Sequence, residues 1–131
     1  MKIDPSGNLL HNFIDSNNLA LARFSAEEQA HLGVHTCPGG DLDSTHSTDA
    51  DYAALPPSLF ELKVGNFYVV LTGEPDRARV LQIIRRYLKP DQRVFVGIIA
   101  PIEPRIKTPE EVRDRVLEAA LYPRRTTRHD G

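Results

Sequence analysis

Short apolar runs alternate with segments of helical periodicity along the middle of the chain. Residues 66–72 and 93–99 form continuous apolar stretches rich in β-branched and aromatic side chains, a pattern typical of parallel strands that are buried on both faces. A shorter apolar run over residues 32–36 indicates a further strand. Because amphipathic segments separate these runs, the sequence predicts an α/β fold with a parallel sheet and right-handed crossovers.

Helices are predicted where apolar positions recur every three to four residues and where capping signals precede them. Ser25 with Glu28, and Thr108 with Glu111, have the residue types and the spacing of a capping box. The predicted helices cover residues 9–21, residues 26 to 30 or 31, residues 52–62, a segment between the turns at 73–76 and 89–91, and a segment from 108 that ends at 123.

Three details of these helices follow from the residue types. A bend or break is expected at Asn17-Asn18, which interrupts the apolar pattern of the first helix. The arginines between residues 77 and 86 are expected to face solvent. The last helix is expected to bury one apolar face, made of Val112, Val116, Leu117 and Ala120.

The first candidate for chemistry lies where the run 32–36 ends. His35 and Cys37 are separated by one residue, and residues i and i+2 of a strand project from the same face. Neutral imidazole and thiolate are common zinc ligands, so the pair indicates a metal site at the end of this strand. A zinc site needs three or four ligands, and the alternative is a His-x-Cys pair that binds nothing.

Two further groups of polar residues are candidates for binding. The polar stretch 38–51 contains Asp41, Asp43 and His46, which could ligate a metal or contact a substrate amine. The alternative is a solvated loop rich in Asx turns. Arg105 could bind a substrate carboxylate through two parallel hydrogen bonds, and the alternative is an ordinary surface arginine.

Length and composition narrow the class of protein. The 131 residues are enough for one domain, expected over residues 1–123, with a disordered tail at 124–131. A net charge of −2 without a basic stripe argues against nucleic acid as a partner. The apolar runs are too short to span a membrane. Cys37 is the single cysteine, so no intrachain disulfide can form and a cytoplasmic location is expected.

Several of these stretches together carry a resemblance to a known family. They read GVHTCPGGD (33–41), DSTHS (43–47), LFEL (59–62), RVFVG (93–97), and PR (104–105) followed by TPEEVRDRVLEAA (108–120). In them the chain resembles the carboxy-terminal catalytic barrel of cobalamin-independent methionine synthase and its shorter homologues. The resemblance implies a (β/α)₈ barrel fold, zinc at the carboxyl ends of the strands, and methyl transfer from a methylated folate to the sulfur of homocysteine.

Residue by residue, the resemblance implies that His35 and Cys37 are zinc ligands and that Glu74 is the ligand after the next strand. We therefore expect Glu74 at the end of the parallel strand adjacent to the one that carries His35. Without the resemblance, Glu74 would be interpreted as a solvated charge at a helix N-terminus. The chain departs from the family at two points: it has no second cysteine to supply the last ligand, and Ile102 occupies the position of a proton-transferring histidine.

The number of predicted strands limits the architecture. Three parallel strands do not close a barrel, so the fold expected is a partial (β/α)₈ barrel of the TIM type. Its uncovered sheet edge or face is expected to promote self-association. The expected function is zinc-dependent methyl transfer, although the isolated chain is expected to lack this activity. The alternative is a truncated, non-catalytic fragment or subunit with an incomplete zinc site.

Overall fold

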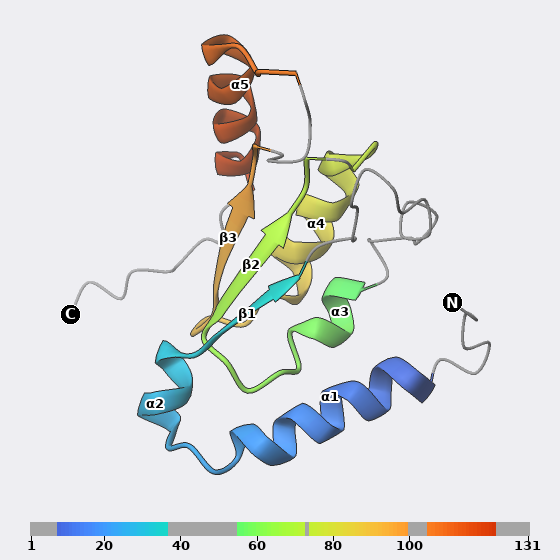
Figure 1. Ribbon diagram of the computed structural model, residues 1–131, viewed down its shortest axis with the longest axis vertical. Helices are drawn as coiled ribbons and strands as arrows, with labels where there is room; N and C mark the ends of the chain where they lie inside the picture. Colours follow the sequence, from blue (N-terminus) through green and yellow to red (C-terminus); the bar gives the residue numbers. More distant parts are fainter. Residues whose placement is uncertain (1–7, 37–54, 73, 100–104, 123–131) are drawn as a thin grey trace.

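The protein is described here by a computed structural model, which covers residues 8–36, 55–72, 74–99 and 105–122 (Figure 1). Helices and strands follow one another in the order that the sequence predicts. The elements are α1 (Asn8–Leu21), α2 (Ala26–His31), β1 (Gly33–Thr36), α3 (Leu55–Leu59), β2 (Asn66–Val70), α4 (Arg77–Tyr87), β3 (Arg93–Gly97) and α5 (Pro109–Ala120). The expected tail at 124–131 lies outside the described residues.

The three strands form one parallel sheet in the order β1-β2-β3. In the register of the sheet, His35 is paired with Tyr68, and Tyr68 is paired with Phe95. Helices α3 and α4 lie on one side of this sheet, while α1 lies against α3 (Figure 1). The predicted α/β fold with three parallel strands and flanking helices is therefore confirmed. The described strands form an open sheet and not a closed barrel.

The hydrophobic core lies between β2 and the helices on one face of the sheet. Phe67 and Val69 of β2 are fully buried, and Phe67 contacts Phe60 edge to face with a ring-centroid distance of 4.9 Å. Val80 and Ile84, which are one helical turn apart in α4, pack into the same cluster. Along β2, the buried Phe67 and Val69 alternate with more exposed residues, so one face of the strand is buried.

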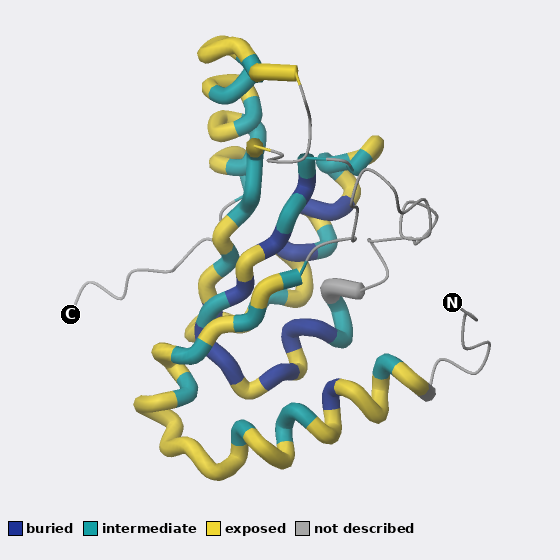
Figure 2. The backbone as a smooth tube through the Cα atoms, viewed as in Figure 1, coloured by how far each residue is buried: buried dark blue, intermediate teal, exposed yellow. Residues whose placement is uncertain are grey.

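The opposite face of the sheet is exposed, which corrects the prediction that the strands are buried on both faces. Tyr68 of β2 and Phe95 of β3 are 45% and 47% exposed. Their rings stack on each other at a centroid distance of 4.8 Å. The exposed positions are drawn in yellow along the strands in Figure 2. The aromatic and β-branched residues of the strands suit burial on both faces of the sheet, but the described helices cover only one face.

The loop before β2 is held against α2 by close backbone packing. Gly65 donates its N–H to the carbonyl oxygen of Gln29 at 2.9 Å. A Cβ at position 65 would collide with the backbone carbonyl of Ala30, so only glycine fits this approach. The side chain of Asn66 adds hydrogen bonds from its Nδ2 to the carbonyl oxygens of Ala30 and Leu32. The end of α2 and the starts of β1 and β2 are thus fixed together.

Helix α1 continues through the two asparagines, so a helix break at Asn17-Asn18 is wrong. Asn17 Nδ2 donates to the carbonyl oxygen of Phe13, one turn earlier in the same helix, at 2.7 Å. Asn18 instead contacts the loop after α3: its Nδ2 donates to Glu61 O at 2.9 Å, and its Oδ1 accepts from Lys63 N at 2.8 Å. Both side chains therefore have partners that leave the helical backbone intact.

Helix α5 presents a different face to the protein than the sequence predicts. The predicted N-cap is confirmed, because Thr108 and Glu111 form both hydrogen bonds of the capping box. However, Val116 and Leu117 are 49% and 57% exposed, and α5 contains no buried residue. The partly buried positions of the helix recur at helical spacing and are Glu111, Val112, Arg115, Glu118 and Ala119. The predicted apolar face is thus turned largely toward solvent.

An ion pair joins α4 to the partly buried face of α5 and corrects a second expectation. Arg77, at the start of α4, is partly buried, and its Nε donates to Glu118 Oε2 of α5 at 3.0 Å. Arg79, Arg85 and Arg86 are exposed, as predicted for all four arginines.

In the described part of the chain, none of the helices combines the length and the apolar character needed to cross a membrane.

Replacing Asn18 by alanine is expected to destabilise the fold. The change removes two hydrogen bonds that join α1 to the loop before β2, so the free energy of unfolding should fall by about 1–2 kcal/mol. Asn17→Ala is the matched control, since it removes only a bond within the helix and introduces a better helix former. Urea unfolding of both variants measures the difference, and equal losses would contradict the tethering role of Asn18.

The exposed aromatic pair leads us to expect concentration-dependent self-association. Apolar sheet surfaces and open strand edges favour pairing with other chains. Tyr68→Lys or Phe95→Lys should shift sedimentation-velocity profiles toward the monomer. Tyr87→Lys is the control, because Tyr87 of α4 is 44% exposed but lies on a helix rather than on the sheet. A wild-type chain that stays monomeric at high concentration would show this expectation to be wrong.

Candidate functional site

The candidate site lies at the carboxyl edge of the sheet. Because β1 and β2 are parallel neighbours, their carboxyl ends lie at the same edge. His35 is the second-last residue of β1, and Glu74 follows β2 after a short turn. The predicted arrangement of the two strands is confirmed, since Glu74 follows the strand adjacent to that of His35. The roles of these residues as ligands stay predictions.

His35 is exposed on the uncovered face of the sheet. It lies beside Tyr68 in the cross-strand register, and Tyr68 in turn stacks on Phe95. Tyr68 also lies over Gly33, where a Cβ would approach its ring to 2.9 Å. The imidazole is therefore accessible from solvent and is flanked by an aromatic pair on one side. A neutral imidazole in this position could bind a metal through either ring nitrogen.

Glu74 is partly buried in the turn between β2 and α4. Its Oε1 accepts a long hydrogen bond of 3.4 Å from the backbone N–H of Asp76, which is the N-cap of α4. Its own backbone N–H donates to Leu71 O at 3.2 Å. The carboxylate thus interacts with the N-terminal end of a helix, as the interpretation without the family predicts. The long contact is a weak one, so it constrains the side chain little.

The described residues contain only part of the predicted zinc site. Cys37, Asp41, Asp43, His46 and Ile102 lie outside them. Within the ranges that the structure describes, no group of three or more His, Cys, Asp or Glu side chains could hold a metal. Imidazole and carboxylate are donor types that zinc accepts, so His35 and Glu74 fit the metal by chemistry. Two donors fall short of the three or four that a zinc site requires.

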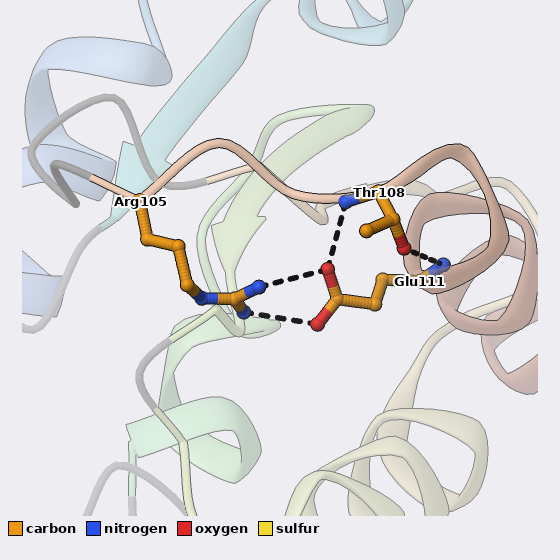
Figure 3. A network of polar contacts seen from close by, with 3 residues as sticks. All are labelled: Arg105, Thr108 and Glu111. Carbon is orange, nitrogen blue, oxygen red and sulfur yellow. Dashed lines mark hydrogen bonds and ion pairs between the residues drawn. The ribbon is translucent and has the colours of Figure 1, made fainter.

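Arg105 holds a carboxylate, but one from its own chain (Figure 3). Its Nη1 and Nη2 donate to Glu111 Oε2 and Oε1 at 3.0 and 2.9 Å, which is the bidentate geometry that the sequence predicts for this residue type. Glu111 Oε2 also accepts from Thr108 N at 2.8 Å. The guanidinium therefore fixes the segment before α5 to the first turn of the helix. Binding of a substrate carboxylate by Arg105 stays a prediction.

This network changes the acidity of Glu111. The hydrogen bond from Arg105 is the main cause, followed by the backbone N–H of Thr108, and together they lower the pKa of Glu111 from 4.5 to about 2. Both contacts favour the ionised carboxylate over the protonated one. The ionised form of Glu111 is therefore the one that the contacts at the start of α5 favour.

The interhelical contact of Arg77 and Glu118 was not predicted from the sequence. The two residues are 41 positions apart and belong to different helices. No local pattern connects them, because the pairing depends on how α4 and α5 pack. The sequence does place Arg77 and Glu118 on two amphipathic helices. It does not tell which residue of the other helix each of them contacts. The same holds for the exposed pair of Tyr68 and Phe95, whose stacking requires the strand register.

Comparison with known proteins adds no further information about this site. No protein-family model matches the chain, and neither the curated proteins nor the solved structures yielded a match.

Lowering the pH is expected to loosen the start of α5. Because folding lowers the pKa of Glu111 from 4.5 to about 2, its ionised form stabilises the fold above pH 4.5, and this stabilisation is lost as the pH falls from 4.5 to 2. The protection of the amides of residues 110–112, measured relative to their intrinsic exchange rates at each pH, should fall over this range. In Glu111→Gln this protection should be lower than in the wild type at pH 5 and should change little with pH, whereas Glu110→Gln should behave like the wild type. An unchanged pH profile in Glu111→Gln would argue against the network.

Proposed function

We propose that this chain supplies a zinc-binding site for methyl transfer to the sulfur of homocysteine, as in the methionine synthase family that its sequence resembles. The observation that carries the proposal is the parallel pairing of β1 and β2. It brings the end of the strand with His35 and the turn with Glu74 to one edge of the sheet. Carboxyl ends of parallel strands are the usual place for active sites in barrels and open α/β sheets.

The residues proposed to hold the metal are His35, Cys37 and Glu74. Imidazole, thiolate and carboxylate form a donor set typical of catalytic zinc, which also keeps a position open for a substrate. Zinc, when bound, supplies a Lewis acid that lowers the pKa of a bound thiol. Glu74 would have to exchange its 3.4 Å contact with Asp76 N for the metal. A hydrogen bond of that length is weak, so the exchange costs little.

The aromatic pair on the uncovered face gives the proposed site an apolar wall. Tyr68 is the cross-strand neighbour of His35, and Phe95 extends the same row. A planar ring such as that of a methylated folate could lie against these side chains by stacking. Their apolar surface would also keep water away from one side of the imidazole. Homocysteine and a methylated folate are accordingly the proposed substrates.

We interpret the sheet as part of a (β/α)₈ barrel. Strands in sequential order with α3 and α4 on one side are the arrangement of consecutive βα units. In a barrel the face with Tyr68 and Phe95 would point inward and be covered by the remaining strands. A thiolate ligand such as Cys37 requires reducing conditions, which supports a cytoplasmic location.

A second candidate function is that of a non-catalytic subunit or fragment with an incomplete zinc site. The specific observation in its favour is the exposure of Tyr68 and Phe95, because a catalytic barrel excludes water from its interior. Under this candidate the chain binds zinc or a partner chain without turning over substrate. Methyl transfer would need additional groups that orient the methyl donor, because orientation supplies a large share of the rate of such reactions.

Zinc content per chain tests the site that both candidates share. The wild type should bind one zinc ion, and Cys37→Ser or His35→Ala should weaken zinc by more than about tenfold, since each removes a ligand. Glu74→Gln should weaken it as well. His31→Ala is the matched control, because His31 is also exposed but ends α2 at the other edge of the sheet. Zinc binding that is equal in all variants would overturn the proposed site.

An activity assay separates the two candidates. The zinc-loaded chain is mixed with homocysteine and a methylated folate, and methionine is measured. For the isolated chain we expect zinc binding without turnover, as the second candidate predicts, because the described part of the chain leaves the site open to solvent. Turnover that is lost in Cys37→Ser and kept in His31→Ala would instead establish the catalytic candidate and exclude the non-catalytic one.

A further inference from the structure

Helix α1 carries a second apolar stripe in addition to the one that packs against the core. Its core-facing residues are Leu10, Ile14 and Leu21, of which Ile14 is only 2% exposed. Leu9 and Phe13 lie on a different side of the helix and are 60% and 52% exposed. Figure 2 draws most of this helix as exposed. Because an apolar stripe on a helix usually faces a packing partner, the second stripe indicates a further contact.

This second stripe, the outer stripe, contains no ionisable side chain. It consists of four exposed residues at intervals of four, three and four positions, namely Leu9, Phe13, Ser16 and Ala20. With 3.6 residues per turn, they lie within an arc of about 60°. The only ionisable side chains of α1 are His11 and Asp15, which pair with each other at 3.1 Å on the far side of the helix. Covering the outer stripe would therefore bury no charge, and lack of charge is typical of the centre of a protein interface.

The sizes of the side chains decide which partner fits the outer stripe. Its N-terminal half is bulky, with Leu9 and Phe13, whereas its C-terminal half is small, with Ser16 and Ala20. In an antiparallel pair of α1 helices, one register places Phe13 opposite Ser16. The same register places Leu9 opposite Ala20, because both pairs are centred between residues 14 and 15. Each large side chain then meets a small one, as in knobs-into-holes packing. A parallel pair would instead oppose large to large and small to small.

We propose that α1 is a dimerisation helix, which pairs antiparallel with α1 of a second copy of this chain through the outer stripe. Such a pair has a two-fold axis, so the assembly closes at two copies. A helix of 14 residues is about 21 Å long, and one pair of such helices makes a contact below the standard interface size of about 1,200–2,000 Å². The dimer is therefore weak and reversible. Because α1 packs against α3, this contact is separate from the open face of the sheet, and it does not rest on the proposed function.

Sedimentation velocity of the full chain tests the contact. The parent for these measurements is Tyr68→Lys, so that association through the open face of the sheet does not contribute. It should form dimers reversibly as its concentration rises. Adding Phe13→Glu should weaken the dimer more than about tenfold, because it places a charge in the contact. Phe24→Glu is the matched control, since Phe24 is also exposed but follows the end of α1. A parent that stays monomeric up to about 1 mM, or equal weakening by both substitutions, would overturn the proposal.

Disulfide cross-linking tests the antiparallel register. Leu9→Cys and Ala20→Cys are prepared separately in a chain that also carries Cys37→Ser and Tyr68→Lys, so that no other thiol is present. When the two variants are mixed and oxidised, they should cross-link with each other, because a disulfide needs Cα atoms within about 7 Å. Each variant alone should cross-link several-fold less, since identical positions lie about 16 Å apart along an antiparallel pair. Cross-linking of Leu9→Cys mainly with itself, or no cross-link in the mixture, would overturn the proposal.

Discussion

The structure depends on the burial of one face of β2. This strand is hydrogen-bonded to a parallel neighbour on each side, and its Phe67 and Val69 are buried. Edge-to-face contact of Phe67 with Phe60 joins the strand to the segment that follows α3. Burial of such side chains is the main favourable term in folding. The other elements are placed by their contact with this strand or with the helices that cover it.

Burial on one face divides the sheet into a core side and an open side. Side chains alternate along a strand, so Tyr68 must face away from the core when Phe67 and Val69 face into it. The parallel register then aligns His35, Tyr68 and Phe95 across the open side. The candidate metal ligand and the aromatic pair thus become neighbours because of the same alternation that builds the core. A surface of this composition is suited to a ligand or to another chain.

Polar contacts take part in the packing of α5 beside apolar ones such as that of Ala119 with the core. Its apolar residues Val116 and Leu117 would form a core-facing stripe by periodicity, yet the partly buried stripe contains Arg115 and Glu118. This stripe, whose Glu118 pairs with Arg77, lies about one residue around the helix from the predicted face. At its N-terminus, the capping box and the salt bridge from Arg105 fix the first turn. Helix α5 is therefore held at both ends by charged side chains.

The sequence by itself determined the elements that depend on neighbouring residues. The capping boxes at Ser25 and Thr108, the order of helices and strands, and the parallel sheet follow from interactions within a few positions and from hydrophobic periodicity. The location of His35 and Glu74 at one edge of the sheet could also be predicted, because parallel strands share their direction.

Only the tertiary structure decided the features that join distant residues. The attachment of α1 rests in part on the bonds of Asn18 to a loop more than forty residues away. The ion pair of Arg77 with Glu118 joins two helices, and the open face of the sheet rests on which side the helices cover. Such contacts depend on the packing of whole elements against one another. Residue type and spacing alone therefore do not specify them, since the same local pattern is compatible with either face of a helix or strand.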